Sequence, residues 1–240
     1  MMCSAEAFND YSGVNSIGWD NKDLIEYYEN VPVSVLRDFA IKGGFENGCD
    51  IDLIYPYIAN TRSIIDVGSA YGRVLNQLIL KKYSGKISSI ERSKNLYKHL
   101  LNKYSKKVNI YNADIRCFHP NAQYEAVLFL WSGIGDFAKS EQLPLLEHMR
   151  SWLKPEGIMI LDTILNTIVP GNASVNDDNS FILNSAYGTA YGYKPSEKEI
   201  DEYGKQLKFK YIKHIPYQTP TQRQRILHIF SNHPLKKLSR

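Results

Sequence analysis

The segment Ser63–Leu75, with the sequence SIIDVGSAYGRVL, constrains the fold of this chain more than any other. A short apolar run predicts a buried β-strand, a turn with two glycines follows, and an apolar pattern of helical spacing comes next. Gly68 and Gly72 can adopt backbone angles that a β-carbon forbids, so the chain can reverse sharply there. Ser69 and Ala70 are small, and the helix that follows directs unpaired N–H groups toward the turn. The segment predicts a small-molecule site at the carboxyl end of a first strand.

The composition bounds the class of protein. A chain of 240 residues suits one α/β domain spanning 1–240. The net charge of +4 is dispersed and does not favour nucleic acid as a partner. Cys3, Cys49 and Cys117 show no paired spacing, which predicts no disulfide framework and a reducing compartment. The first residues do not resemble a secretory signal, and no apolar run reaches about 18 residues, so we expect a cytoplasmic protein without a membrane partner.

Helical patterns precede the first strand and form a predicted N-terminal helical cap over residues 1–60. They cover about 21–30, with Asp20 as a candidate N-cap, then 34–41 and 50–57.

Strands and helices alternate from Ser63 onward, which predicts parallel βαβ units in an open α/β sheet. The further predicted strands are 86–91, 108–111, 124–131 and 158–162, and the helices between them are 93–105 and 139–153. The spacing Ser196-x-x-Glu199 then predicts a capping box that opens a helix to about Gln206. Strands at 207–217 and 223–230 would form a closing antiparallel pair. Residues 164–194 match no period, and such a long stretch inside a compact domain is typically functional or mobile.

The glycine spacing after the first strand indicates which ligand the turn suits. The dinucleotide fingerprint G-x-G-x-x-G fails here, because Ala70 and Arg73 occupy two of its glycine positions. The spacing Asp66-x-Gly68-x-x-x-Gly72 instead resembles motif I of the class I S-adenosylmethionine (SAM)-dependent methyltransferases, and the alternative is a generic strand–turn–helix. The segment Leu153–Gly157, LKPEG, is similar to the family's L-K-P-G-G turn before its fifth strand.

This resemblance covers residues 60–163 firmly and 195–231 loosely. It implies a Rossmann-like, open, doubly wound, mostly parallel seven-stranded sheet with the strand order 3-2-1-4-5-7-6. It also implies SAM as the cofactor and S-adenosylhomocysteine (SAH) as the product. Residues 164–194 would be an insertion near the substrate site.

The resemblance assigns cofactor contacts to the strand ends. Beside the motif I residues Asp66, Gly68, Ser69, Ala70 and Gly72, the implied contacts are Glu91, Arg92, Asp114, Ile115, Leu130 and Trp131. The two oxygens of a carboxylate at Glu91 match the two hydroxyls of a ribose. Asp114 and Ile115 would contact the adenine, Arg92 would lie along it, and Leu130 and Trp131 would lie near the methyl group. The alternatives are a surface glutamate, a turn aspartate and a solvated arginine.

The absence of certain motifs narrows the range of methyl acceptors that we expect. It has neither an Asn/Asp-Pro-Pro-aromatic segment nor a Pro-Cys pair, and Asp162-Thr163 replaces the Asp-Asn of metal-dependent catechol-type enzymes. We therefore expect methyl transfer to nitrogen or oxygen of a small molecule, without a metal. An RNA or protein methyltransferase, or a SAM-binding protein without catalysis, are the alternatives.

A general base is needed only when the acceptor is protonated at the working pH. The candidates are Asp136, His148, Tyr28 and the tyrosines of 187–193, of which Asp136, just past the fourth strand, is the best placed. Asp136 could equally cap the next helix.

Overall fold

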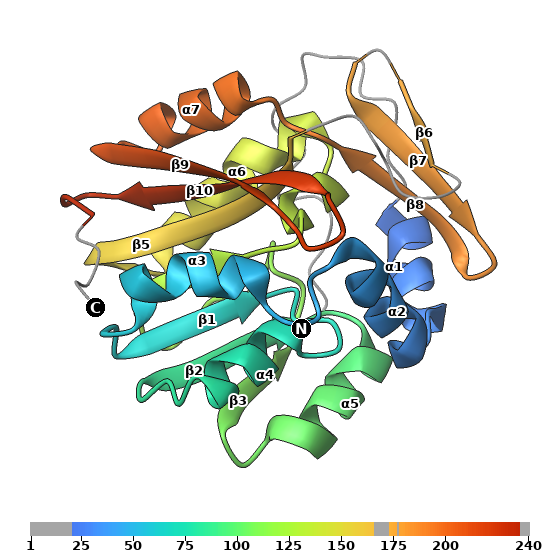
Figure 1. The fold of residues 1–240 in the computed structure, drawn as a ribbon, viewed down its shortest axis with the longest axis horizontal. Coiled ribbons are helices and arrows are strands. Elements are labelled where there is room, and N and C mark those ends of the chain that lie inside the picture. Colours follow the sequence, from blue (N-terminus) through green and yellow to red (C-terminus); the bar gives the residue numbers. More distant parts are fainter. Residues whose placement is uncertain (1–20, 166–172, 177, 236–240) are drawn as a thin grey trace.

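A computed structural model describes residues 21–165, 173–176 and 178–235, and its centre is a seven-stranded sheet (Figure 1). The strands are β1 (Ser63–Val67), β2 (Lys86–Glu91), β3 (Val108–Asn112), β4 (Tyr124–Phe129), β5 (Leu153–Ile164), β9 (Tyr211–Gln218) and β10 (Gln224–Ser231). Their order is β3-β2-β1-β4-β5-β10-β9. The pairs among β1–β5 are parallel, whereas β10 is antiparallel to both neighbours. The order and the mostly parallel sheet that the resemblance implied are thus confirmed.

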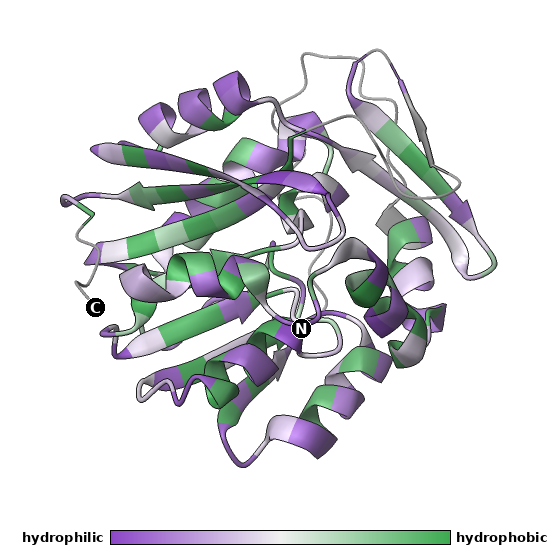
Figure 2. Ribbon diagram, in the orientation of Figure 1, coloured by the Kyte–Doolittle hydropathy of each residue, from purple (hydrophilic) through white to green (hydrophobic). Residues whose placement is uncertain are grey.

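Helices cover both faces of this sheet. They are α1 (Asn21–Asn30), α2 (Val33–Gly43), α3 (Cys49–Ile58), α4 (Arg73–Leu80), α5 (Lys94–Tyr104), α6 (Lys139–Ser151) and α7 (Glu197–Gln206), with a short 3₁₀ helix η2 (Gly133–Asp136). Successive strand residues point to opposite faces. Ile64 belongs to the core that contains residues of α3, α4 and α5, while its neighbour Ile65 belongs to the core that contains residues of α6 and α7. Apolar residues accordingly dominate β1 and β5 in Figure 2.

The predicted helix boundaries agree closely with the structure. The three helices before β1 are confirmed; α2 ends at Gly43, its C-cap residue Gly44 has a φ of 79°, and α3 contains Pro56. The Oγ of Ser93 accepts a hydrogen bond from the Leu96 N–H as an N-cap, and the capping box at the start of α7 is present. The candidate cap Asp20 lies outside the described residues.

Three predicted strand boundaries were wrong. The sixth strand was expected from Leu207, but Leu207 caps α7 and Lys208 adopts a φ of 59°, so β9 begins only at Tyr211. The fourth strand ends at Phe129 rather than at residue 131, because the residues after Leu130 turn away in a left-handed conformation. The fifth strand begins at Leu153, inside the segment expected to be a turn.

The segment without a sequence period contributes a second, antiparallel sheet. It consists of β6 (Ala173–Val175), β7 (Ser180–Ser185) and β8 (Gly188–Tyr193). β8 packs against α1 and η2, so segments far apart in the sequence lie side by side (Figure 1). Apolar side chains of α1 and α2 share a third core with Ala190 of β8 and with Tyr71 of the glycine turn. The N-terminal helices and β8 therefore form one structure next to that turn.

A chain of hydrogen bonds crosses the antiparallel end of the main sheet. Thr163 Oγ1 is 2.8 Å from His228 Nε2, the Nδ1 atoms of His228 and His214 are 2.7 Å apart, and His214 Nε2 is 2.8 Å from an Asp201 carboxylate oxygen. His228 is fully buried. Its burial, together with the nearby His214, lowers its pKa to about 3.

Within the described ranges, no helix has the length and apolar character needed to cross a bilayer. Cys49 is a free thiol, whereas Cys117 is disulfide-bonded. The expectation of a chain without disulfides was therefore wrong, and the cysteine spacing no longer supports a reducing compartment.

Candidate active site

The two glycines of the turn after β1 have different structural roles. Both have positive φ, 67° at Gly68 and 86° at Gly72. A β-carbon at Gly72 would lie 2.4 Å from a ring carbon of Tyr104, so this glycine lets α5 pack against the start of α4. A β-carbon at Gly68 would meet nothing within 4 Å. The backbone at Gly68 therefore borders open space, as a ligand that approaches the main chain requires.

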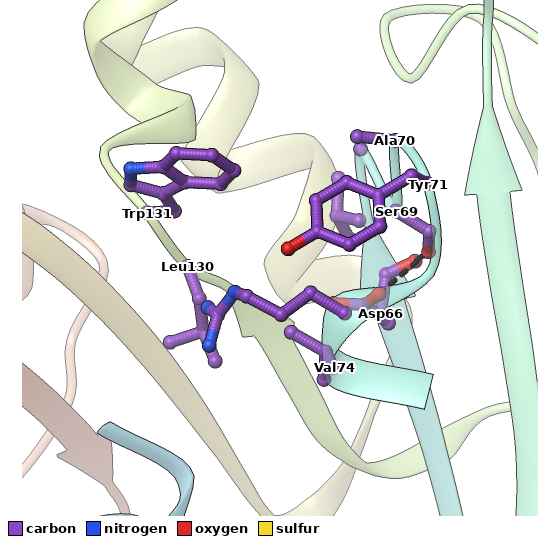
Figure 3. A pocket seen from close by; sticks show the side chains of 10 residues that line it. Asp66, Ser69, Ala70, Tyr71, Val74, Leu130 and Trp131 are labelled. Carbon is purple, nitrogen blue, oxygen red and sulfur yellow. Dashed lines mark hydrogen bonds between the residues drawn. The ribbon is translucent and has the colours of Figure 1, made fainter. Parts of the chain in front are cut away.

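A pocket opens beside this turn, at the carboxyl ends of β1 and β4. It is lined by Asp66, Val67, Gly68, Ser69, Ala70, Tyr71, Arg73, Val74, Leu130 and Trp131. In Figure 3 the indole of Trp131 lies on one side, facing Tyr71 and Ala70 on the other. The structure thus brings together the predicted residues of motif I, except Gly72, with the predicted pair Leu130 and Trp131. The carboxyl ends of central strands are where open α/β sheets bind ligands.

Asp66 lies at the base of the pocket in a network of hydroxyl groups. Ser69 Oγ donates to the Asp66 carboxylate at 2.6 Å, and Ser89 Oγ donates to Ser69 Oγ at 2.8 Å. Asp66 is 2% exposed, and this burial raises its pKa to about 7. These hydrogen bonds link the turn after β1 to the ends of β1 and β2 and so stabilise its conformation.

Glu91, the predicted ribose acid, faces the turn and is not a solvated surface residue. It is 6% exposed, and its two oxygens accept hydrogen bonds from the backbone N–H groups of Ala70 (2.8 Å) and Ser93 (2.9 Å). Burial raises its pKa, although these N–H donors and the charge of Arg92 oppose the rise. Each carboxylate oxygen has a further lone pair, so the side chain can still accept from hydroxyl donors.

The predicted adenine residues have other partners in the structure and do not line the pocket. Asp114 accepts from the backbone N–H and guanidinium of Arg116, with a shortest contact of 2.6 Å, and Arg92 approaches it at 3.5 Å. Burial disfavours the charge of Asp114, but Arg116 outweighs it and lowers the pKa. Ile115 belongs to the core beside Phe118. A contact from Asp114 to an adenine amine would replace the long contact with Arg92.

A buried ion pair that was not predicted from the sequence holds the wall of the pocket at Trp131. Trp131 and Ser132 both have positive φ, at 54° and 62°. Asp162 holds this turn, because its carboxylate accepts from the Trp131 N–H at 3.0 Å and its carbonyl accepts from the Ser132 N–H at 3.1 Å. Arg225 binds the Asp162 carboxylate at 2.6 Å and donates to Ser132 Oγ at 2.6 Å, while Tyr217 donates to Asp162 at 3.1 Å. The polar end of an apolar β5 was the sequence signal for this pair.

A second buried ion pair joins the turn to the N-terminal helices. Arg73, at the start of α4, donates to both carboxylate oxygens of Asp50 at 2.7 Å. Two guanidinium groups contact the ring of Phe45, that of Arg73 at 5.4 Å and that of Arg225 at 4.9 Å from the ring centroid. Such cation–π contacts are stronger when they are desolvated. The partners come from three separate segments of the chain, so no local sequence pattern predicted this arrangement.

Two of the candidate bases, Asp136 and Tyr28, contact each other. The Tyr28 hydroxyl donates to Asp136 Oδ2 at 2.9 Å. Burial raises the pKa of Asp136 to about 6, against the opposing effects of Tyr28 and Arg92. The alternative that Asp136 caps α6 is wrong, since Ala138 occupies the N-cap position. His148 is not part of the site, because its ring packs on Trp152 in the core.

Helix α1 is fixed to the start of α5 by Glu29. Its carboxylate accepts from the backbone N–H of Lys94 at 2.7 Å and of Asn95 at 3.3 Å, and from the Ser93 hydroxyl at 3.3 Å. A carboxylate at a helix N-terminus is favoured by unpaired N–H groups and the helix dipole. This contact holds Tyr28 near Asp136. In the part of the chain that the structure describes, no group of three or more His, Cys, Asp or Glu side chains could hold a metal ion.

The sheet order and the pocket at the turn after β1 define the Rossmann-like fold of the SAM-dependent methyltransferases. The chain is similar to such a methyltransferase from Clostridium acetobutylicum, with a TM-score of 0.63 and 14% identity over 82% of this chain and 96% of that chain. DesVI from Streptomyces venezuelae is similar with a TM-score of 0.58 and 16% identity, over 82% of this chain and 98% of that chain. SAM-bound CalS10 from Micromonospora echinaspora is similar with a TM-score of 0.58 and 14% identity, over 84% of this chain and 98% of that chain. No protein-family model and no curated protein sequence matches the chain. At these identities the likeness establishes the fold.

Proposed function

We propose that this protein is a methyltransferase that transfers the methyl group of SAM to a nitrogen or oxygen atom of a small molecule. The observation that carries the proposal is the open space at Gly68, in the pocket between the glycine turn and Trp131. Structures of the same fold support it. CalS10 is described as an amino pentose methyltransferase bound to SAM, and a Burkholderia thailandensis 1,6-didemethyltoxoflavin-N1-methyltransferase holds its acceptor and SAH.

The residues present suit the cofactor. The backbone from Gly68 to Ala70 would hold it against the end of β1, and Glu91 would accept from the ribose hydroxyls. Leu130 and Trp131 would cover the methionine portion. Asp114, which is not among the pocket-lining residues, would contact the adenine in place of Arg92. Bound there, SAM supplies a methyl group on a sulfonium that is already activated as a leaving group. The task of the chain is then to hold the acceptor in line with that methyl group, which can account for much of the rate.

The acceptor would bind on the side that α1, η2 and β8 enclose. These elements pack on one another, and Tyr27 and Tyr28 of α1 make an edge-to-face pair with ring centroids 5.1 Å apart. Aromatic walls with a few polar groups are typical of small-molecule sites. We infer that residues 164–194, which supply β8, contribute to acceptor binding within a single domain.

The direct test measures binding and turnover separately. Isothermal titration of the purified protein with SAM, SAH and NADH should give saturable binding of the first two and none of the third. Release of SAH on adding amines and hydroxyl compounds should then show transfer. Absence of SAM and SAH binding by the folded protein would refute the proposal. Binding without SAH release for any acceptor would instead identify a SAM-binding protein without catalysis.

A further inference from the structure

The carboxylate of Asp136 has capacity for a further hydrogen bond. Its Oδ2 accepts from Tyr28, whereas no described residue donates to its Oδ1. Asp136 as a whole is half-buried in η2, so it is not fully enclosed by the protein. A buried or half-buried carboxylate in a protein is usually paired, so an oxygen without a donor suggests a site for one.

This carboxylate is close to the cofactor turn. Asp136 and Tyr28 both lie within electrostatic range of Glu91, and Glu91 binds the backbone of Ala70 in the pocket wall. Arg92 also acts on Asp136, and its positive charge favours the ionised carboxylate. Among the described residues, the charged and titratable groups near Asp136 are therefore Tyr27, Tyr28, Glu91 and Arg92.

Two tyrosines of α1 lie near the same carboxylate. Tyr27 packs on the edge of Tyr28 and is itself within electrostatic range of Asp136 and of Tyr187. Aromatic faces attract cations, and the attraction is stronger where water is excluded. A carboxylate with aromatic neighbours is an environment that favours positive charge.

We propose that the methyl acceptor is a primary or secondary amine whose N–H donates to Asp136 Oδ1. This inference rests on the proposed methyl transfer and names its substrate class. The amine lone pair forms the new N–C bond while the electron pair of the C–S bond goes to sulfur, which gives SAH. The nitrogen becomes positively charged in this step and then loses a proton to Asp136 or to water.

The charge that develops on the acceptor distinguishes an amine from a hydroxyl group. A neutral amine gains positive charge as it is methylated, and the adjacent carboxylate stabilises that charge in the transition state. A hydroxyl group must lose its proton during attack, and a carboxylate is a weak base for that purpose. Asp136 thus favours nitrogen over oxygen.

The experiment compares matched acceptors that differ only in the reacting atom. 2-Phenylethylamine and 2-phenylethanol, with further amine and alcohol pairs of other shapes, are tested for SAH release by the full chain with saturating SAM. The variant D136N keeps an oxygen for Tyr28 but removes the charge. D52N, at an exposed position on α3, is the matched control. Titration with SAH reports cofactor binding in every variant.

We expect methylation of amines but not of their alcohol partners, and a loss of about 100-fold in kcat in D136N, the size typical of removing one electrostatic contact to a transition state. SAH affinity should be unchanged in D136N, and D52N should behave as wild type. Faster methylation of alcohols than of matched amines, equal amine rates in D136N and wild type, or no turnover of any amine by a protein that binds SAM would each overturn the inference. Failure to bind SAM would instead overturn the proposed function.

Discussion

The carboxylate of Glu91 accepts a hydrogen bond of 2.8 Å from the backbone N–H of Ala70, which joins the end of β2 to the turn after β1. Its other oxygen is held by the Ser93 N–H at the start of α5. The side chain is therefore oriented before any ligand arrives. A prepositioned carboxylate costs less free energy of ordering when it binds, which is the general advantage of preorganisation.

Replacing Gly68 with valine should abolish SAM and SAH binding while the protein still folds. Valine would place methyl groups in the space that a ligand needs, since a β-carbon there meets no protein atom within 4 Å. The φ of 67° adds a conformational cost of about 1–2 kcal/mol for a residue with a β-carbon. Isothermal titration gives the affinity, and circular dichroism and thermal unfolding give the fold.

Gly188→Ala is the matched control for this strain, since Gly188 also has positive φ but lies in β8, outside the pocket lining. It should be destabilised yet bind SAH normally. A folded Gly68→Val protein that binds SAM with wild-type affinity would contradict the assigned turn.

Replacing Glu91 with alanine should weaken SAH binding by about 1–3 kcal/mol, the typical contribution of hydrogen bonds to a charged group. Stability should fall as well, because the N–H groups of Ala70 and Ser93 lose their acceptor. The ribose role is tested with the 2′-deoxy analogue of SAH. Wild type should prefer SAH over this analogue, and Glu91→Ala should show little preference. An undiminished preference in the variant would place the ribose elsewhere.

Arg225→Ala should destabilise the protein by about 3–5 kcal/mol, because it leaves the fully buried Asp162 carboxylate without its charge partner. Denaturant unfolding measures the change. The double variant D162N/R225M should lose less, since it removes both charges together. Lys81→Ala, which breaks the more exposed pair with Asp52, should cost only about 0–1 kcal/mol. Equal losses of unfolding free energy in Arg225→Ala and Lys81→Ala would show that the buried pair contributes no more to stability than the exposed one.

Stability should decline as the pH falls from 6.5 toward 3, in part because of His228. The pKa of this histidine is about 3 in the folded protein and about 6.5 when unfolded. The unfolded chain therefore binds more protons between these values, and folding loses up to ~1.4 kcal/mol per pH unit from this group. Above pH 6.5 its contribution is fully present. His214, Thr163 and Asp201 are the polar neighbours on the same hydrogen-bond chain.

Unfolding by guanidinium chloride at several pH values measures this slope. The variant His228→Gln keeps an amide donor and acceptor between Thr163 and His214 but cannot titrate. Its stability should depend less steeply on pH over this window than that of wild type. Parallel curves for the two proteins would assign the acid sensitivity to other groups.

The sequence predicted the parts of the fold that local patterns determine. Apolar strands and helix caps such as Ser93 and Ser196 placed most elements within a few residues. The glycine spacing located the turn on which the pocket is built. The strand order came from the resemblance, because a single βαβ pattern is compatible with several orders.

The rest depends on contacts between distant segments. Asp162 with Arg225 and Arg73 with Asp50 join residues far apart in the chain, and no local period marks such pairs. The antiparallel sheet of β6–β8 was missed because its side chains are largely half-buried or exposed, so the alternation of a one-sided strand is weak. Asp136 was identified from its position after β4, but its partner Tyr28 lies in α1 and only the folded chain reveals the contact.

Ser93 stands between two carboxylates, with its N–H on Glu91 and its hydroxyl on Glu29. Ser93 therefore supports two parts of the proposed site. It holds Glu91, which would bind the ribose, and it contacts Glu29 of α1, the helix on the proposed acceptor side. A homologue with substitutions in β7 and β8 that suit another acceptor can keep the contacts of Ser93 unchanged. A homologue with a different α1 must keep an acidic residue at position 29. Without it, Ser93 loses a partner, and Ser93 directly contacts Glu91.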